Sequence, residues 1–286
     1  MSGPTGAGPG AGPGSDAEPG AGPPAELVAE LERFAARGRV LVALDFDGVL
    51  APIVDEPSAA RALPASAAAL ERLVATTDVA LVSGRALDDL RACAQPPAGV
   101  VLVGGHGTQS SLDEGVDGAD GAGGAALSAE QAALLERLGA ELDAVATGRE
   151  GVHVERKPMS AVLHTRRAAR EVAAEATALA LAGPGALPGV HALRGKEVVE
   201  LGAVQLGKGG GVRRLREALS AAGGPVGAVL FAGDDVTDED AFAALSPDAG
   251  DVTVKVGGGP TAARHRVGSP RDVAALLALL ADLRGR

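Results

Sequence analysis

The stretch Arg39-Val-Leu-Val-Ala-Leu-Asp45-Phe-Asp47-Gly48 decides the fold. A continuous apolar run that ends in an acidic residue is typical of a strand buried on both faces of a parallel sheet. Ligands of an open α/β sheet bind beyond the carboxyl ends of its strands, so Asp45 and Asp47 can converge on one metal or one substrate. Aspartate and glycine also favour a solvated strand-to-loop turn. The stretch by itself leaves both interpretations open.

Apolar runs alternate with helical patterns on both sides of this stretch. We expect further strands at 78–82, 100–103, 226–231 and 251–256. We expect helices at 26–37, 65–75, 86–94, 212–222, 239–245 and 273–283. This alternation predicts a doubly wound parallel α/β sheet of the Rossmann-like kind, with helices on both faces.

The alternation breaks between residues 109 and 202. A Gly-rich loop at 115–124 precedes a predicted helix at 129–146, and a second helix is expected at 168–181. Predicted strands at 152–156 and 161–165 form a hairpin, and two more are expected at 190–193 and 198–201. We therefore expect an α+β domain at 109–202, inserted over the active-site edge of a core domain made of 25–108 and 203–286.

Composition narrows the class of protein. The first 24 residues are almost entirely Gly, Ala and Pro, so we expect a disordered tail that has little to bury. Hydrophobic residues make up 46% of the 286 residues, but there is no Trp or Tyr, and the net charge is −11. Scarce aromatic side chains and an acidic surface argue against nucleic acid as a partner. No apolar run reaches the roughly 18 residues of a membrane span, and no secretory signal is visible, so we expect a cytoplasmic protein without membrane contact.

Three further polar clusters follow predicted strands or open predicted helices. Ser83-Gly84-Arg85 can seat an anion through a hydroxyl and the N–H groups of a helix start, although Ser is also a common helix N-cap. Lys208 stands among glycines that would let a phosphate approach closely, although it could equally be a solvated lysine. Five acids crowd the segment 234–240, and hard oxygen ligands with room for water suit Mg²⁺.

Taken together, the four clusters resemble in order and placement the four motifs of haloacid dehalogenase-like phosphatases. The resemblance implies that Asp45 attacks phosphorus and becomes an aspartyl phosphate. It implies that Asp47 protonates the leaving sugar oxygen and later activates water. Such a nucleophile would split one difficult displacement into two easier steps.

The same resemblance implies how the phosphoryl group is held. Ser83 and Lys208 would bind the transferred phosphoryl group. Asp234, supported by Asp238, would hold Mg²⁺ alongside Asp45 and the backbone carbonyl of Asp47. The residues leave open whether Asp235 or Asp238 is the supporting acid.

Longer strings resemble the trehalose-6-phosphate phosphatases over about residues 25–283. They are 44–53, 103–107, 233–242 and 256–264, together with a cap-like pattern of alternating polar residues in the predicted hairpin. The resemblance implies trehalose 6-phosphate as the substrate, hydrolysed to trehalose and phosphate in trehalose biosynthesis. His106, between glycines, is expected to shape a hinge rather than to ligate a metal. The substrate-binding residues implied in this way are Gly84, Arg85, His106, Glu155, Lys157, His164, Arg166 and Glu200.

Three positions depart from the family pattern. Val49 stands where Thr is more common, Gln109 where Glu is frequent and Thr165 where Tyr is frequent. Three other functions stay open besides hydrolysis of trehalose 6-phosphate. They are a phosphatase acting on sucrose phosphate or a glucosyl-glycerate phosphate, a phosphosugar mutase, and a catalytically silent sugar-phosphate sensor.

Overall fold

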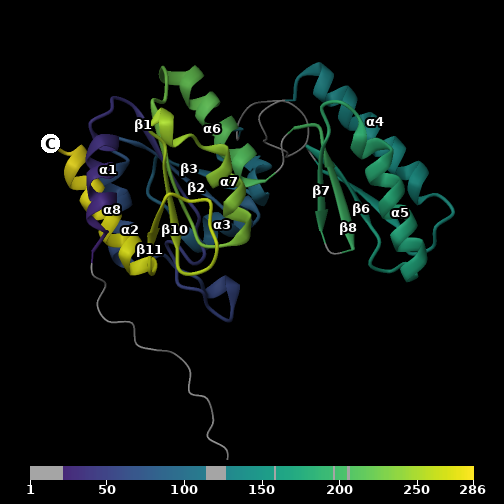
Figure 1. Cartoon of the computed structure of the whole chain (residues 1–286), viewed down its shortest axis with the longest axis horizontal. Coiled ribbons are helices and arrows are strands. Elements are labelled where there is room, and N and C mark those ends of the chain that lie inside the picture. The colour runs from purple at the N-terminus through teal and green to yellow at the C-terminus, as the bar shows by residue number, and fades with distance from the viewer. Residues whose placement is uncertain (1–21, 114–126, 158, 196, 205–206) are drawn as a thin grey trace, which may run out of the picture.

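The computed structural model describes residues 22–113, 127–157, 159–195, 197–204 and 207–286. Most of the predicted tail and the predicted Gly-rich loop lie outside these residues. The chain forms a large lobe and a small lobe (Figure 1). The small lobe consists of α4 to α5 and β5 to β8, whose bounds follow below, and the large lobe contains the remaining elements.

A seven-stranded sheet forms the centre of the large lobe. Its order is β11-β10-β9-β1-β2-β3-β4, and all neighbours run parallel except β3 and β4. The strands are β1 (Val40–Leu44), β2 (Asp78–Val82), β3 (Val100–Gly104), β4 (Gln109–Ser110), β9 (Ala228–Gly233), β10 (Val252–Val256) and β11 (His265–Val267).

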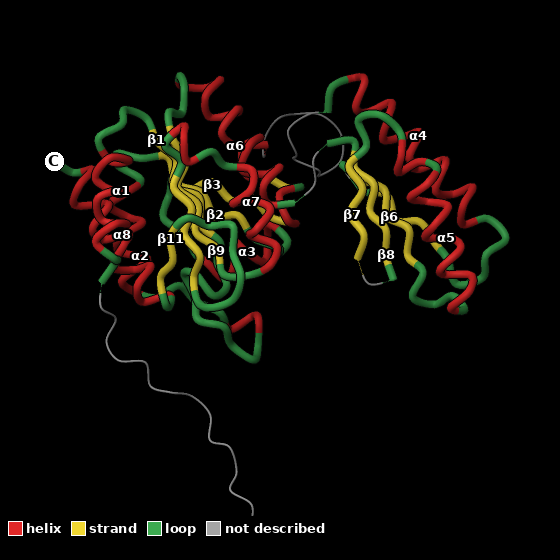
Figure 2. Tube along the Cα trace, in the orientation of Figure 1, coloured by secondary structure: helices red, strands yellow, loops and turns green. Residues whose placement is uncertain are grey.

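Helices cover both faces of this sheet (Figure 2). The helices are α1 (Ala25–Ala35), α2 (Pro64–Leu73), α3 (Leu87–Ala94), α6 (Lys208–Gly223), α7 (Glu239–Ala244) and α8 (Pro270–Arg284). Alternate residues of β1 point to opposite faces: Val42 packs in a cluster with α1, α2 and α8, whereas Leu41 packs in a cluster with α6 and α7. The predicted doubly wound α/β sheet is confirmed.

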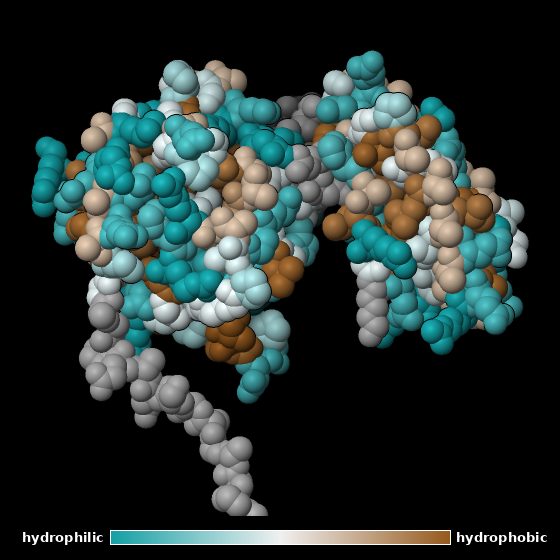
Figure 3. Space-filling model, in the orientation of Figure 1, coloured by the Kyte–Doolittle hydropathy of each residue, from teal (hydrophilic) through white to brown (hydrophobic). Residues whose placement is uncertain are grey.

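The small lobe is one antiparallel sheet with two helices on one face. The sheet has the order β5-β6-β8-β7, and the helices pack on it through an apolar cluster. The elements are α4 (Ala129–Ala146), β5 (His153–Arg156), β6 (Ser160–His164), α5 (Arg170–Ala182), β7 (His191–Gly195) and β8 (Val198–Gly202). The other face of the sheet looks toward the large lobe (Figure 1). A hollow separates the two lobes on the side drawn in Figure 3.

Helix α6 begins four residues earlier than the sequence predicts. Three glycines follow Lys208 and disfavour a helix by propensity, yet they lie in its first turn. A Cβ at Gly209 would meet the Asp240 carbonyl oxygen at 2.4 Å, and one at Gly211 would meet Gly107 Cα at 2.8 Å. Close packing therefore requires glycine there, and tertiary contacts override the propensity.

Among the described residues, no helix has both the length and the apolar character needed to cross a membrane.

Candidate active site

The sheet order brings the predicted clusters to one edge. β1 lies between β2 and β9, and the three strands run parallel. Asp45, Ser83 and Asp234 follow their carboxyl ends, and Lys208 opens α6 beside them. They line a cavity of about 420 Å³ together with other residues of the large lobe: Asp47, Ile53, Gly84, Arg85, His106, Asp235 and Thr237.

Lys208 is a buried cation between two carboxylates. Its Nζ lies 2.7 Å from Asp45 Oδ2 and 2.7 Å from Asp238 Oδ1, and the residue is 2% exposed. Burial lowers the pKa of Lys208, but the charges of Asp45 and Asp238 act against it, and the net shift is upward. Burial raises the pKa of Asp45, and the nearby Asp238 charge adds to that rise while Lys208 opposes it.

Both carboxylate oxygens of Asp238 accept hydrogen bonds from other groups of the protein. Its Oδ2 accepts hydrogen bonds from the backbone N–H groups of Asp234 and Asp235, both at 2.9 Å, while Oδ1 accepts one from Lys208. Asp235 is exposed, and its side chain accepts a hydrogen bond from the N–H of Val236. Of the two acids that the sequence leaves open, Asp238 is the buried one that shapes the loop after β9.

The acidic groups at this edge fit a hard divalent cation. Asp45, Asp234 and Asp238 each offer an oxygen, and the three oxygens lie within 4.8 Å of one another. Burial raises the pKa of Asp234 to about 6, and the charge of Asp238 adds to the shift. Lys208 forms ion pairs with only two of these three carboxylates, so a cation with oxygen ligands would relieve their repulsion.

Gly48 lets the backbone after Asp47 approach Asp234. Its φ is +73°, a conformation that favours glycine. A Cβ there would lie 2.0 Å from Asp234 Oδ2. The backbone can therefore pack this closely against the Asp234 carboxylate only because residue 48 has no side chain.

Arg85 faces Asp47. Its Nε donates to Asp47 Oδ2 at 2.6 Å and its Nη2 to Asp47 Oδ1 at 2.8 Å. These hydrogen bonds raise the pKa of Arg85 further above its ordinary value. Arg85 was predicted to bind substrate from the family resemblance, whereas here its charge is directed to a neighbouring carboxylate.

His106 stands at the junction of the two lobes. Its φ of +54° lies in the left-handed region, and its ring covers Gly84, where a Cβ would meet the ring at 2.6 Å. Partial burial and the charge of Lys208 lower the pKa of His106. Glu200 and Lys157 of the small lobe also act electrostatically on the ring, so these two groups lie near His106.

The predicted sugar-binding residues form two polar pairs on the small lobe. Glu200 Oε1 accepts from Ser160 Oγ at 2.6 Å and lies 3.4 Å from Lys157 Nζ. Glu155 Oε2 lies 2.8 Å from His164 Nε2. Val162 of β6 pairs with Glu155 on the neighbouring strand β5 and with Glu200 on the other neighbour, β8. Glu155 and Glu200 therefore lie on the same face of the sheet.

Two of the predicted sugar-binding residues follow the strands of the small lobe instead of lying in them. β5 ends at Arg156 and β6 at His164, so Lys157 and Arg166 come after the strands rather than continuing their alternation, and Arg166 is exposed. Gln109 accepts a hydrogen bond from the Leu87 N–H at 2.9 Å, at the start of α3. That bond gives the side chain a structural partner in the large lobe.

Lys255 is a site residue that the sequence analysis did not identify. It is 4% exposed, and its Nζ donates to the backbone carbonyls of Asp234 and Asp235 at 2.6 and 3.3 Å. The ammonium thereby fixes the loop that carries Asp234. A lone lysine inside the apolar run 252–256 was the available signal, because an unpaired charge is costly to bury.

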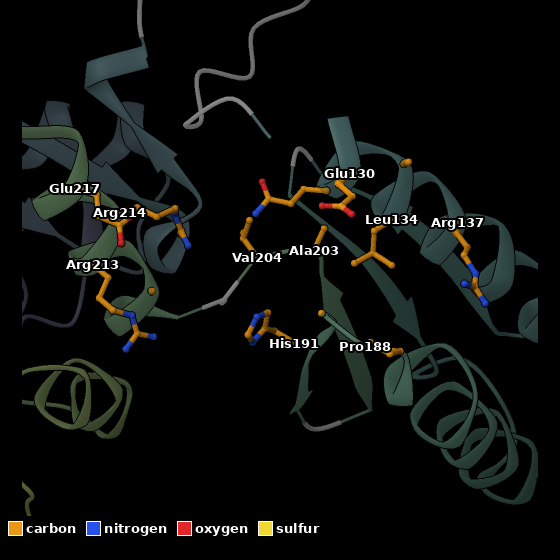
Figure 4. A pocket seen from close by; sticks show the side chains of 14 residues that line it. Glu130, Leu134, Arg137, Pro188, His191, Ala203, Val204, Arg213, Arg214 and Glu217 are labelled. Carbon is orange, nitrogen blue, oxygen red and sulfur yellow. The ribbon is translucent and has the colours of Figure 1, made fainter. Parts of the chain in front are cut away.

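A larger cavity lies between the lobes but shares no lining residue with the candidate active site. Its volume is about 710 Å³, and Figure 4 shows side chains from both lobes around it, including Arg214 and His191. The predicted catalytic groups are absent from its described lining. The buried charged groups Asp45 and Lys208 line the smaller cavity, which is therefore the candidate active site.

A family model, curated proteins and solved structures are similar to this chain. A family model described as trehalose-phosphatase matches residues 43–271. Trehalose-phosphate phosphatases from Mycobacterium marinum and Mycobacterium avium are 35% and 36% identical over 84% and 83% of this chain, which spans 58% of the length of each relative. The structure of Aspergillus fumigatus trehalose-6-phosphate phosphatase superposes with a TM-score of 0.67 at 25% identity, over 89% of this chain and 97% of that one.

Proposed function

Because the chain belongs to the trehalose-phosphatase family, we propose that it hydrolyses trehalose 6-phosphate to trehalose and phosphate, as a step of trehalose biosynthesis. The observation that carries the proposal is the buried Lys208 between Asp45 and Asp238 at the floor of the cavity. A cation held beside a carboxylate at the carboxyl edge of the sheet provides both a nucleophile and a partner for phosphoryl oxygens.

The first step transfers the phosphoryl group to the protein. An Asp45 oxygen forms a bond to phosphorus while the bond between phosphorus and the sugar oxygen breaks. The electron pair of that bond stays on the sugar oxygen, which takes a proton from the carboxyl group of Asp47. Ser83 and Lys208 bind the phosphoryl oxygens during the transfer.

The second step regenerates the protein. A water molecule attacks phosphorus, and its proton passes to the Asp47 carboxylate. The bond between phosphorus and Asp45 breaks, and inorganic phosphate leaves. The carboxyl group of Asp47 is then protonated again for the next substrate.

We assign the metal site to Mg²⁺, held by Asp45, Asp234 and the backbone carbonyl of Asp47, with Asp238 in support. When bound, the ion supplies charge neutralisation at the phosphoryl oxygens. The clustered carboxylate oxygens and the raised pKa of Asp234 support this assignment.

We assign the small lobe, which runs from α4 to β8 because Gln109 and Ser110 join the large-lobe sheet as β4, as a cap that binds the sugar. The residues proposed to contact it are Glu155, Lys157, His164, Arg166 and Glu200. The face that carries Glu155 and Glu200 looks toward the large lobe across a hollow. Closure of that hollow would bring sugar contacts and phosphoryl contacts onto one substrate and exclude water.

Phosphate release over a panel of sugar phosphates with Mg²⁺ tests the substrate. We expect the largest kcat/KM for trehalose 6-phosphate, and essentially no turnover by Asp45→Asn. A larger value for sucrose phosphate or a glucosyl-glycerate phosphate would replace the substrate but keep the chemistry. A sugar bisphosphate or an isomerised sugar phosphate as product would indicate a mutase. A folded protein without turnover on any member of the panel would indicate a sensor.

A further inference from the structure

Every nitrogen of the Arg85 guanidinium has a partner inside the large lobe. Besides the two hydrogen bonds to Asp47, Nη1 donates to Asp89 Oδ2 at 2.8 Å and Nη2 to the Pro57 carbonyl at 2.8 Å. The guanidinium carbon lies 5.7 Å from the centroid of the Phe46 ring. Only 10% of the side chain is exposed. Arg85 is therefore fixed on several sides, with little freedom to follow a substrate.

Of the two carboxylates that pair with Arg85, Asp47 is the one that faces the cavity of the candidate active site. Its side chain is 33% exposed and lines the same cavity as Asp45. A guanidinium and a carboxylate that pair through two parallel hydrogen bonds fix each other's orientation as well as their distance. Arg85 thus determines which edge of the Asp47 carboxyl group faces the cavity.

We propose that Arg85 is a positioning residue for Asp47, and that it does not itself bind the sugar phosphate. This inference rests on the proposed function, because it concerns the group that exchanges a proton with the leaving sugar oxygen. Asp47 lies beyond the end of β1, and without the guanidinium its side chain could adopt other rotamers. A misplacement of about 1 Å near reacting atoms can cost on the order of 100-fold in rate.

The requirement for a proton depends on the leaving group, and this dependence tests the inference. A sugar alcohol needs a proton to leave, whereas p-nitrophenolate leaves readily without one. We expect Arg85→Gln to lower the rate of alcohol release from trehalose 6-phosphate by about 10- to 100-fold, with KM nearly unchanged. Release of p-nitrophenol from p-nitrophenyl phosphate should fall much less. Single-turnover measurement of the released alcohol or phenol keeps the later attack of water out of both rates.

A merely structural role, or direct binding of the phosphoryl group, predicts a different pattern. Either would lower both rates by the same factor or raise KM for both substrates, and either result would overturn the inference. Arg85→Lys should recover little, because an ammonium cannot reproduce the two parallel hydrogen bonds. Arg91→Gln, in α3 just after Arg85, is the matched control and should leave both rates unchanged.

A double-mutant cycle tests whether Arg85 acts through Asp47. In an Asp47→Ala background, Arg85→Gln should cause no further loss of the rate on trehalose 6-phosphate. A full additional loss would show that Arg85 acts independently, and would contradict the inference.

A separate outcome would identify failure of the proposed substrate. If the wild-type protein hydrolyses another sugar phosphate instead, the same cycle is run on that compound, since any sugar alcohol needs the proton. The inference then stands or falls on the cycle, while the assignment of trehalose 6-phosphate has already failed.

Discussion

Lys208 is the only lysine or arginine that an ion pair joins to Asp45 among the described residues, and it also contacts Asp238. Removing one partner of a buried ion pair leaves an uncompensated charge, which is more damaging than the pair is stabilising. Asp45 and Asp238 would then repel each other across a space that water barely reaches. The residue therefore links the chemistry of the site to the stability of the fold.

We predict that Lys208→Met lowers the free energy of unfolding by about 3 kcal/mol at about pH 8. The loss should be smaller at about pH 5, because the unpaired carboxyl groups can then bind a proton. Urea unfolding at the two pH values measures both. An equal loss at both would show that lost packing, rather than the unpaired acids, causes the destabilisation.

A second residue-scale prediction concerns Mg²⁺ and pH. The pKa of Asp234 is raised from 3.8 to about 6 in the folded protein. The contribution of this carboxyl group to the free energy of unfolding is therefore fully present below the pKa of the unfolded chain, and it is lost as the pH rises through about 6. Mg²⁺ binds the deprotonated carboxylates and competes with those protons. The increase in Tm caused by Mg²⁺ should therefore be larger at about pH 8 than at about pH 5. Asp234→Asn should abolish most of the difference, and an unchanged difference would remove Asp234 from the metal site.

At the scale of elements, α6 shows how packing selects sequence. Two of the three glycines in its first turn, Gly209 and Gly211, lie where α7 and the segment after β3 approach the helix closely. The turn delivers Lys208 to the cavity at the cost of helix propensity. Glycine disfavours a helix at these positions, and the tertiary contacts override this local preference.

We predict that Gly209→Ala destabilises the protein although alanine is the better helix former. The new Cβ would meet the Asp240 carbonyl oxygen at 2.4 Å, and a backbone atom cannot move aside easily. We expect a loss of about 1–3 kcal/mol, as for overpacked cores, measured by thermal or urea unfolding. Gly38→Ala, where a Cβ would meet nothing within 4 Å, is the control. A stabilised Gly209→Ala variant would mean that the helix start can shift.

The buried strands could be predicted from the sequence because strands covered on both faces are continuous apolar runs. β2 is observed at its predicted bounds, as is α4. β4 and β11 were missed, since strands of two and three residues carry no periodic pattern. The grouping of Asp45, Ser83 and Asp234 was predictable, because parallel strands end at one edge. The pairing of Arg85 with Asp47 was not, since it depends on side-chain directions that spacing does not determine.

At the scale of the whole molecule, the two lobes divide the proposed work. Charged groups that suit a phosphoryl group line the large-lobe cavity, whereas Lys157 and Glu200 belong to the small lobe. The cytoplasmic location and the exact limits of the inserted domain stay predictions.

The division predicts that Lys157→Ala separates two substrates. The variant loses a contact to the sugar but leaves Asp45, Asp47 and Lys208 in place. Its kcat/KM for trehalose 6-phosphate should fall by at least about tenfold, because sugar binding holds the phosphate in line. Its kcat/KM for p-nitrophenyl phosphate should change little. Equal losses on both substrates would assign Lys157 to the fold or to the phosphoryl site instead.

Asp45 is proposed to carry the phosphoryl group during turnover, and rapid quenching can detect the group on this residue. Protein mixed with trehalose 6-phosphate and Mg²⁺ is quenched in acid within one turnover, digested and analysed by mass spectrometry. We expect one added phosphoryl group on the peptide that contains Asp45, and none in Asp45→Asn, which should also release no phosphate. Phosphate release with that peptide unmodified, or an Asp45→Asn variant within about tenfold of the wild-type rate, a barrier change of only about 1.4 kcal/mol, would contradict it.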